Sequence, residues 1–111
     1  MNELSFVATA CFVGELEDSD TFVIAFADNA ENPQHTFELQ RPLEGKGYST
    51  VLTSGAVFEG GIEGFDLQNN VLTLNYAANA QQVLQVSRIQ VTLDLDPMVV
   101  DRVRAEIAGM V

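Results

Sequence analysis

The stretch IEGFDLQNNVLTLNY, residues 62–76, predicts a β-hairpin, and the rest of the fold can be built outward from it. Its centre is Asn69-Asn70, and asparagine tolerates the left-handed backbone conformation that a tight hairpin turn requires. The resulting register pairs Leu67 with Leu72, Phe65 with Leu74 and Glu63 with Tyr76 on one face, and Asp66 with Thr73 on the other. Because one register yields an apolar face and a polar face, the pattern favours an antiparallel pair packed on a core.

Further segments alternate or concentrate apolar residues in the way that strands do. They lie at residues 4–13, 21–27, 36–41, 51–59 and 87–95, the fourth being the weakest pattern. The first segment is predicted as one long strand, with one face made of Leu4, Phe6, Ala8, Ala10 and Phe12. The pair Gly60-Gly61 marks a turn or a close approach of the backbone to a neighbour.

Two helices are predicted in the C-terminal third of the chain. The first covers residues 75–84, with Asn75 as N-cap and a stripe of Tyr76, Ala80 and Leu84. The second opens at Asp96-Pro97, because aspartate caps a helix and proline at the first position loses no needed donor. Its buried stripe is Val99 or Val100, Val103, Ile107 and Met110. On its exposed face, Arg102 and Glu106 have the spacing of an ion pair.

These elements predict an α+β fold. We expect a single, mostly antiparallel sheet of about six to seven strands, with one short helix and a C-terminal helix packed on one face. Residues 1–111 are expected to form one domain, since the chain is short and has no internal linker or repeat.

The charge of the chain is strongly one-sided. Residues 1–40 hold eight carboxylates and no Lys or Arg, and the whole chain has 16 acids, 5 bases and a net charge of −11. Nucleic acid and anionic membranes repel such a protein, whereas basic partners attract it. The single Cys11 suits a reducing compartment and is expected to be a small buried hydrophobe. We therefore predict a cytoplasmic location, without a membrane span or leader.

The sequence offers almost no candidates for catalytic or metal-binding residues. His35 is the only histidine and lies in a polar loop, where it is expected to be solvated. No phosphate-binding, dinucleotide-binding or G-x-S-x-G motif is present. The acidic run at residues 17–20 fails as a calcium loop, since Val23 and Asn29 stand where glycine and glutamate are needed. We expect no catalytic residues, no metal, no cofactor and no enzyme activity.

The acidic turns carry the functional hypothesis. One set lies between the strands at 4–13 and 21–27, and the other follows the strand at 21–27, so they can fall at opposite ends of the sheet. The candidate partner-binding residues, chosen by charge and expected exposure, are Glu15, Glu17, Asp18, Asp20, Asp28 and Glu31. A plain solubility face is the alternative interpretation. Arg41 shares the inward parity of Phe37 and Leu39, and it either snorkels, pairs with a carboxylate such as Glu59, or contacts a partner.

The order of short motifs resembles one known family. These motifs are F-x-A at 6–8, F-x-L-Q-R at 37–41, G-G-I-E at 60–63, L-T-L at 72–74 before an alanine-rich helix, and the final strand and helix. In this order they are similar to the immunity protein ten family of bacterial polymorphic toxin systems, over nearly the whole chain. One departure is Glu59, since the family leads us to expect an aromatic residue there; Phe58 lies one position earlier.

The resemblance implies a cytoplasmic antitoxin, encoded beside a toxin and holding its C-terminal toxin domain inactive. Many such toxin domains are nucleases with basic clefts. The mechanism would be stoichiometric occlusion, in which carboxylates meet the Lys and Arg of the cleft and a few aromatic anchors supply dry contact. The alternative is a structural or self-associating α+β module without a toxin partner, and the sequence leaves a homodimer open. Salt dependence separates the two, because only acid-driven association slows as ionic strength rises.

Overall fold

The computed structural model of the chain describes residues 2–16 and 18–111. Over these residues the chain forms nine strands and two helices, which confirms the predicted α+β class. The elements are β1 (Asn2–Ala8), β2 (Ala10–Leu16), β3 (Thr21–Ala27), β4 (Thr36–Pro42), β5 (Ser49–Leu52), β6 (Val57–Glu59), β7 (Ile62–Gln68), β8 (Val71–Tyr76), α1 (Ala78–Leu84), β9 (Val86–Leu93) and α2 (Pro97–Met110).

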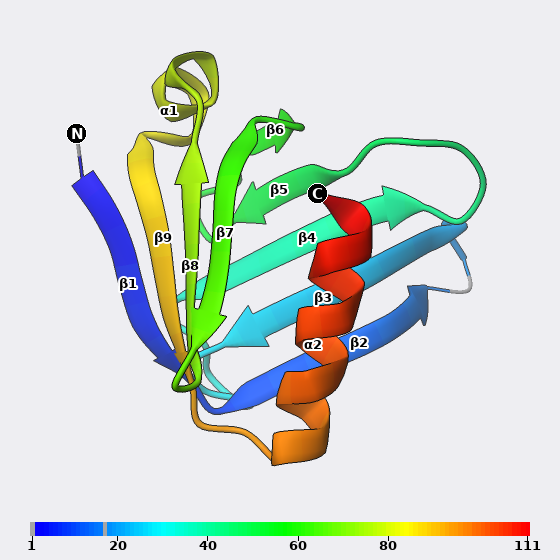
Figure 1. Cartoon of the computed structure of the whole chain (residues 1–111), viewed down its shortest axis with the longest axis vertical. Coiled ribbons are helices and arrows are strands. Elements are labelled where there is room, and N and C mark those ends of the chain that lie inside the picture. The colour runs from blue at the N-terminus through cyan, green and yellow to red at the C-terminus, as the bar shows by residue number, and fades with distance from the viewer. Residues whose placement is uncertain (1, 17) are drawn as a thin grey trace.

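The strands form two sheets, so the prediction of a single sheet of six to seven strands is wrong. A five-stranded antiparallel sheet has the order β2-β3-β4-β5-β6, and a four-stranded sheet has the order β1-β9-β8-β7 (Figure 1). Within the second sheet, β1 runs parallel to β9 and the other pairs are antiparallel. Each sheet has one strongly apolar face, and these two faces share one core with the inner side of helix α2.

The change of sheet occurs at Thr9, inside the segment predicted as one long strand. The Thr9 N–H donates to the Ala27 carbonyl at 3.0 Å, and the Thr9 hydroxyl donates to the Asp28 carbonyl at 2.8 Å. The inward and outward positions are exchanged after this break. Ala8 is fully buried, but Phe12 faces outward with 47% of its surface exposed. The predicted common face of Phe6 and Phe12 is therefore wrong.

Cys11 takes the inward position that the break creates. It lies opposite Phe26 in the ladder between β2 and β3 and is half-buried. Burial raises the pKa of its thiol to about 11, against a smaller opposing effect of the Arg102 charge. The thiol is therefore protonated at neutral pH, as expected for a cysteine that packs as an apolar side chain.

The predicted hairpin at residues 62–76 is largely confirmed. Leu67 pairs with Leu72, Phe65 with Leu74 and Asp66 with Thr73, as predicted. Asn69 and Asn70 have φ values of 53° and 62°, the left-handed conformation that the turn requires. The last predicted pair is wrong, because the register shifts between Ile62 and Gly64 and places Ile62, not Glu63, opposite Tyr76.

Helix α1 has the predicted stripe but not the predicted cap. Tyr76, Ala80 and Leu84 are all buried. Asn75 remains in β8, and the N-cap position is Ala77, which makes no side-chain capping bond. The Ala77 N–H instead donates to the Gly61 carbonyl at 2.8 Å. A backbone contact to the turn before β7 thus fixes where this helix begins.

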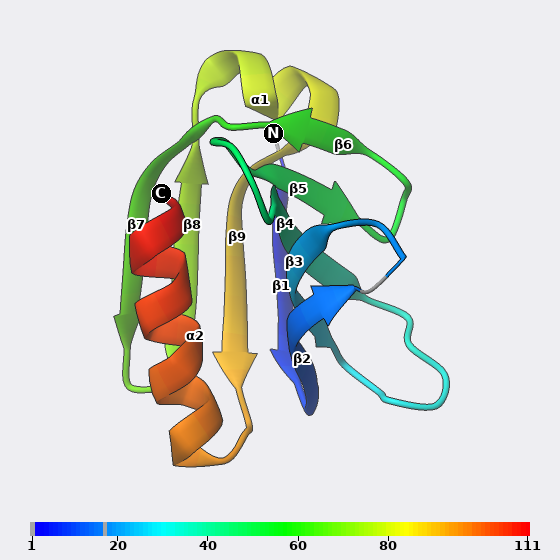
Figure 2. The ribbon, with the colours of Figure 1, turned by 90° about the vertical axis from the view of Figure 1, so that its right-hand side faces the viewer.

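Helix α2 begins as predicted, with the Asp96 carboxylate accepting the Met98 N–H at 2.8 Å. Val100, Val103 and Ile107 are buried on its inner face. The helix crosses β2, β3 and β4 in Figure 1 and stands beside β7 and β8 in Figure 2. It therefore covers the core-facing side of the five-stranded sheet and closes the space next to the four-stranded sheet.

The exposed face of α2 differs from the prediction in one detail. The expected pair was Arg102 with Glu106, but the ion pair that forms joins Arg104 Nη1 to Asp101 Oδ1 at 2.9 Å. Both spacings bring side chains together on a helix surface, so the pattern alone did not discriminate between them.

Polar bridges tie the two sheets together. The hydroxyls of Thr50 on β5 and Tyr76 on β8 lie 2.7 Å apart and form a buried hydrogen bond. The Tyr48 hydroxyl accepts the N–H of Ile62 at 2.9 Å, which joins the approach to β5 with the start of β7. These contacts fix the placement of the sheets in a way that apolar packing alone does not.

Candidate partner-binding surface

The predicted acidic residues fall into two groups at opposite ends of β3. Glu15, Asp18 and Asp20 lie at the end of β2 and in the turn to β3, whereas Asp28 and Glu31 lie in the loop from β3 to β4 (Figure 1). Glu17 lies outside the described residues. The fold thus brings the first group together and holds the second group away from it.

Hydrogen bonds hold the described residues of the turn from β2 to β3. The Ser19 N–H donates to the Leu16 carbonyl at 3.2 Å, and the Thr21 hydroxyl donates to the Ser19 carbonyl at 2.9 Å. Asp20 has a φ of 50°, a conformation that aspartate adopts more readily than most residues. Glu15, Asp18 and Asp20 are exposed. Their charges are therefore available to a partner without unfolding of the turn.

This turn borders a surface hollow of about 610 Å³. The Leu43 N–H donates to the Asp20 carbonyl at 2.9 Å, which joins the turn to the loop after β4. Asp20 and Glu44 contribute carboxylates to the lining, and Arg41 contributes the one basic group. The hollow therefore carries mixed charge with an acidic excess.

Arg41 packs on an aromatic ring. Its guanidinium carbon lies 4.5 Å from the centroid of the Phe22 ring, and Nη1 donates to the Pro42 carbonyl at 3.4 Å. The cation–π contact accounts for its inward parity, since the stem passes along β4 while the charged end reaches the hollow. Pairing with Glu59 was one of three predicted roles, beside snorkelling and contact with a partner, and the observed contact with Phe22 takes its place.

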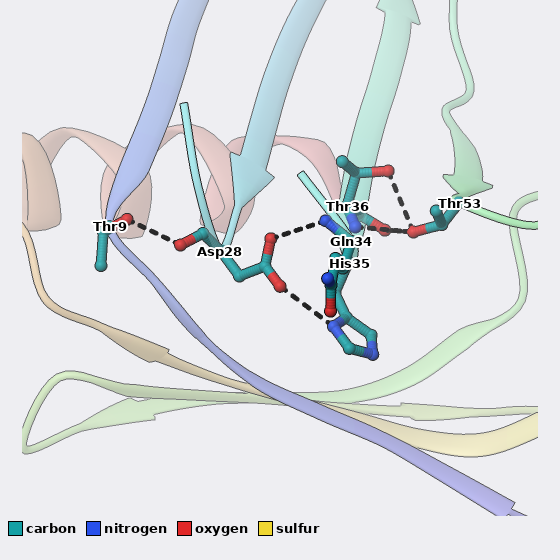
Figure 3. A network of polar contacts seen from close by, with 6 residues as sticks. All are labelled: Thr9, Asp28, Gln34, His35, Thr36 and Thr53. Carbon is teal, nitrogen blue, oxygen red and sulfur yellow. Dashed lines mark hydrogen bonds and ion pairs between the residues drawn. The ribbon is translucent and has the colours of Figure 1, made fainter. Parts of the chain in front are cut away.

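At the other end of β3, Asp28 closes the loop to β4 (Figure 3). Its Oδ1 accepts the Gln34 N–H at 3.0 Å, its Oδ2 lies 3.0 Å from Nδ1 of His35, and its own N–H donates to the His35 carbonyl at 3.2 Å. The hydrogen bond to His35 lowers the pKa of the Asp28 carboxyl, and the Gln34 bond adds to the shift. Asp28 thus has a structural role in this loop, beside its predicted role as a contact.

Glu31 is presented by the same loop. The Asn29 side-chain oxygen accepts the N–H groups of Glu31 at 2.8 Å and of Asn32 at 3.1 Å, which forms an Asx turn. The side chain of Glu31 is exposed. The second acidic group therefore consists of one carboxylate used in loop closure and one directed to solvent.

His35 is less free than a solvated loop histidine. Half of its side chain is exposed, but its ring stacks on Phe6 with centroids 5.9 Å apart. Nearby, the Thr53 hydroxyl accepts the Thr36 N–H at 2.6 Å and lies 3.1 Å from the Thr36 hydroxyl (Figure 3). The His35 ring thus has Asp28 as its polar partner, and the Thr36 and Thr53 hydroxyls lie within hydrogen-bonding distance of each other.

A family comparison matches Immunity protein 10 over residues 7–101. The chain belongs to the Immunity protein 10 family. The matched range includes β2 to β9, the start of α2 and both acidic groups. Neither a curated protein nor a solved structure matched this Immunity protein 10 chain.

Two further properties concern the described residues of the Immunity protein 10 chain. No helix among them is long and apolar enough to cross a membrane. Within residues 2–16 and 18–111, no three His, Cys, Asp or Glu side chains gather into a group that could hold a metal ion.

Sequence reasoning missed one prominent feature of this Immunity protein 10 surface. Phe12 was predicted to share a face with Phe6, but it stands exposed on β2 a few residues before the acidic turn. Finding it required knowledge of the break at Thr9, and a threonine between two alanines in an apolar run is a weak signal for such a break. The exposed aromatic residue therefore lies on the strand that leads into the acidic turn.

Proposed function

We propose that this chain is a cytoplasmic antitoxin that binds a cognate toxin domain and neutralises it by one-to-one occlusion. Membership of the Immunity protein 10 family is the observation that carries the proposal. In this role the chain needs no catalytic residues, metal or cofactor. It works by covering a surface of its partner.

The charge distribution supports a basic partner, such as the cleft of a nuclease. The chain has a net charge of −11, and the Glu15, Asp18 and Asp20 carboxylates are exposed at the end of β2 and in the turn that follows it. Carboxylates placed in this way speed the encounter with a basic surface and select it over acidic or neutral surfaces. Asp28 and Glu31 provide a second acidic point at the far end of β3.

The first test is co-expression with the C-terminal domain of the toxin encoded beside this chain. We expect rescue of growth and co-purification of a one-to-one complex. Absence of both, with soluble toxin domain present, would contradict the proposal and favour a structural module. Co-purification without rescue would contradict occlusion of the toxic surface.

Charge-reversal variants then test the acidic turn. The triple variant Glu15→Lys, Asp18→Lys, Asp20→Lys should slow association by about tenfold or more, because it replaces attraction by repulsion at the contact. The control Glu63→Lys, Asp66→Lys, Asp94→Lys changes the net charge by the same amount at exposed positions elsewhere. Equal slowing by both variants would assign the effect to net charge alone and remove the turn from the interface.

A further inference from the structure

Strand β2 is an open edge of the five-stranded sheet. In the part of the chain that the structure describes, it pairs with β3 alone, over all seven of its residues and without a register shift. An edge strand presents N–H and C=O groups on its free side, and another chain can pair with them. The strand is therefore a template for one more strand.

The other edges carry features that discourage pairing. Strand β6 has only three residues, and β7 has a register shift at Ile62 and exposed Glu63 and Asp66. Strand β1 has a register shift after Asn2 and an ion pair from Glu3 to Arg88. Bulges, short lengths and charges are the usual means by which proteins protect sheet edges. β2 is the long, regular edge that remains.

Large apolar side chains surround β2. Phe12 is 47% exposed, and Met98 at the start of α2 is 81% exposed. Both line one surface hollow of about 410 Å³, together with Cys11, Val13, Val99 and Arg102. A Cβ on Gly14 would lie 3.2 Å from the Phe12 ring, so the ring lies along its own strand and leaves its outer face to solvent. A partner that pairs with the free edge can therefore bury the exposed side chains of Phe12 and Met98.

The charges next to β2 indicate which kind of partner can bind along this strand. Glu15 lies on the strand, and Asp18 and Asp20 follow in the turn, all exposed. Arg102 on α2 lines the hollow beside Phe12, so these three carboxylates outnumber one base. A second copy of this chain would bring two molecules of net charge −11 together and place like charges side by side. An extended segment rich in Lys and Arg gains from the same carboxylates. Charge complementarity therefore favours a basic strand over a second copy.

We propose that β2 binds an extended, basic segment of the toxin domain as a sixth strand of the five-stranded sheet. Phe12 and Met98 are the apolar anchors, and the carboxylates of the adjacent turn pair with Lys and Arg of the added strand. Main-chain bonds supply affinity and side-chain contacts supply selectivity, as in other cases of strand addition. The inference rests on the proposed antitoxin function and assigns it a surface.

The test compares arginine substitutions at exposed apolar positions. Phe12→Arg and Met98→Arg should each weaken binding of the co-expressed toxin domain by about tenfold or more, because each removes an apolar anchor from the interface and adds a charge that the basic segment repels. Val83→Arg on α1 is the matched control, since Val83 is 50% exposed and receives the same charge. Val7→Arg places the same charge on the edge strand β1, where Val7 is 49% exposed, and it should leave binding unchanged if β2 is the edge that binds.

Hydrogen exchange of the wild-type complex tests the strand directly and needs no variant to fold. Toxin binding should slow exchange of alternate amides in residues 10–16. Binding with unchanged exchange there, or equal affinity of Phe12→Arg and Val83→Arg, would overturn the assignment of β2 while leaving the antitoxin function in place. Failure of the wild-type chain to bind would instead overturn the proposed function itself. Protection of β2 in a complex of two copies, without toxin, would replace the basic partner by self-association.

Discussion

At the residue scale, the hydrogen bond between Tyr76 and Thr50 is important because it is buried and joins the two sheets. The two oxygens lie 2.7 Å apart, and Thr50 is fully buried. Burial raises the pKa of Tyr76 well above its ordinary value of 10.0, against the opposing effect of the Thr50 bond. The neutral hydroxyl is therefore the form that the fold requires.

Removing either hydroxyl should destabilise the protein and leave the other group unsatisfied. We expect Tyr76→Phe and Thr50→Val each to lower the free energy of unfolding by about 1–3 kcal/mol. The double variant should lose less than the sum, because no orphaned hydroxyl remains. Urea denaturation of the four proteins measures the coupling, and strictly additive losses would contradict it.

The raised pKa of Tyr76 predicts that the protein loses stability at alkaline pH. This raised pKa means that the unfolded chain releases the Tyr76 proton first, so stability falls as pH rises above about 10. The slope of unfolding free energy against pH between about 9 and 11 should be shallower in Tyr76→Phe than in the wild type. Equal slopes in the two proteins would show that Tyr76 does not limit alkaline stability.

At the scale of elements, Gly61 sets the distance between the turn before β7 and helix α1. Its φ is 88°, and a Cβ built on it would lie 2.8 Å from the Ala80 Cβ. It would also lie 3.3 Å from the Phe58 ring, so the aromatic residue one position earlier than expected still packs on this glycine. The close approach predicted from Gly60-Gly61 is thus confirmed for Gly61.

The two neighbouring glycines form a matched pair of variants. Gly60 also has a positive φ, of 74°, but nothing lies within 4 Å of an added Cβ. We expect Gly60→Ala to lower the free energy of unfolding by about 1–2 kcal/mol from backbone strain alone. Gly61→Ala should lose about 1–3 kcal/mol more, because Ala80 must move. Thermal unfolding of both variants measures the difference, and similar losses would show that α1 shifts freely.

The loop from β3 to β4 should respond to acid through Asp28. The pKa of this carboxyl is lowered from 3.8, chiefly by the hydrogen bond to His35, so its contribution to stability is present above that value. The contribution is lost as pH falls through the lowered pKa. The stability gap between the wild type and Asp28→Asn should therefore narrow between about pH 5 and pH 2. Glu31→Gln, in the same loop with an exposed carboxylate, is the control, and a constant gap for Asp28→Asn would contradict the assignment.

Elements that depend on neighbours in the sequence were predictable, and the division into two sheets was not. The hairpin turn at Asn69-Asn70, the strand β3 and the cap at Asp96 follow from local patterns and are all present. The break at Thr9 is stabilised by hydrogen bonds to the carbonyls of Ala27 and Asp28, which lie 18 and 19 residues further along the chain. Such distant partners leave no periodic trace, so the parity of Phe12 was misassigned. The acidic turn was predictable, whereas the exposed aromatic residue beside it was not.

At the scale of the whole molecule, ionic strength should act on stability and on partner binding with opposite signs. The chain has 16 acids and 5 bases, so its charges repel one another in the compact state. Raising the ionic strength from about 0.01 to 0.15 M shortens the screening length from about 30 to 8 Å and weakens this repulsion. The same screening weakens the attraction of a basic partner. Salt should therefore stabilise the free protein while it slows formation of the complex.

Both effects can be measured in one series of sodium chloride concentrations. We expect the melting temperature of the free chain to rise with salt, since repulsion outweighs ion pairs such as Glu3 with Arg88. The association rate with the toxin domain should fall over the same range. The charge-reversed triple variant should show a flatter dependence on salt for both quantities. Replacing Glu15, Asp18 and Asp20 by lysine makes the net charge six units less negative. An association rate that is independent of salt would show that apolar contact, and not the carboxylates, guides the encounter.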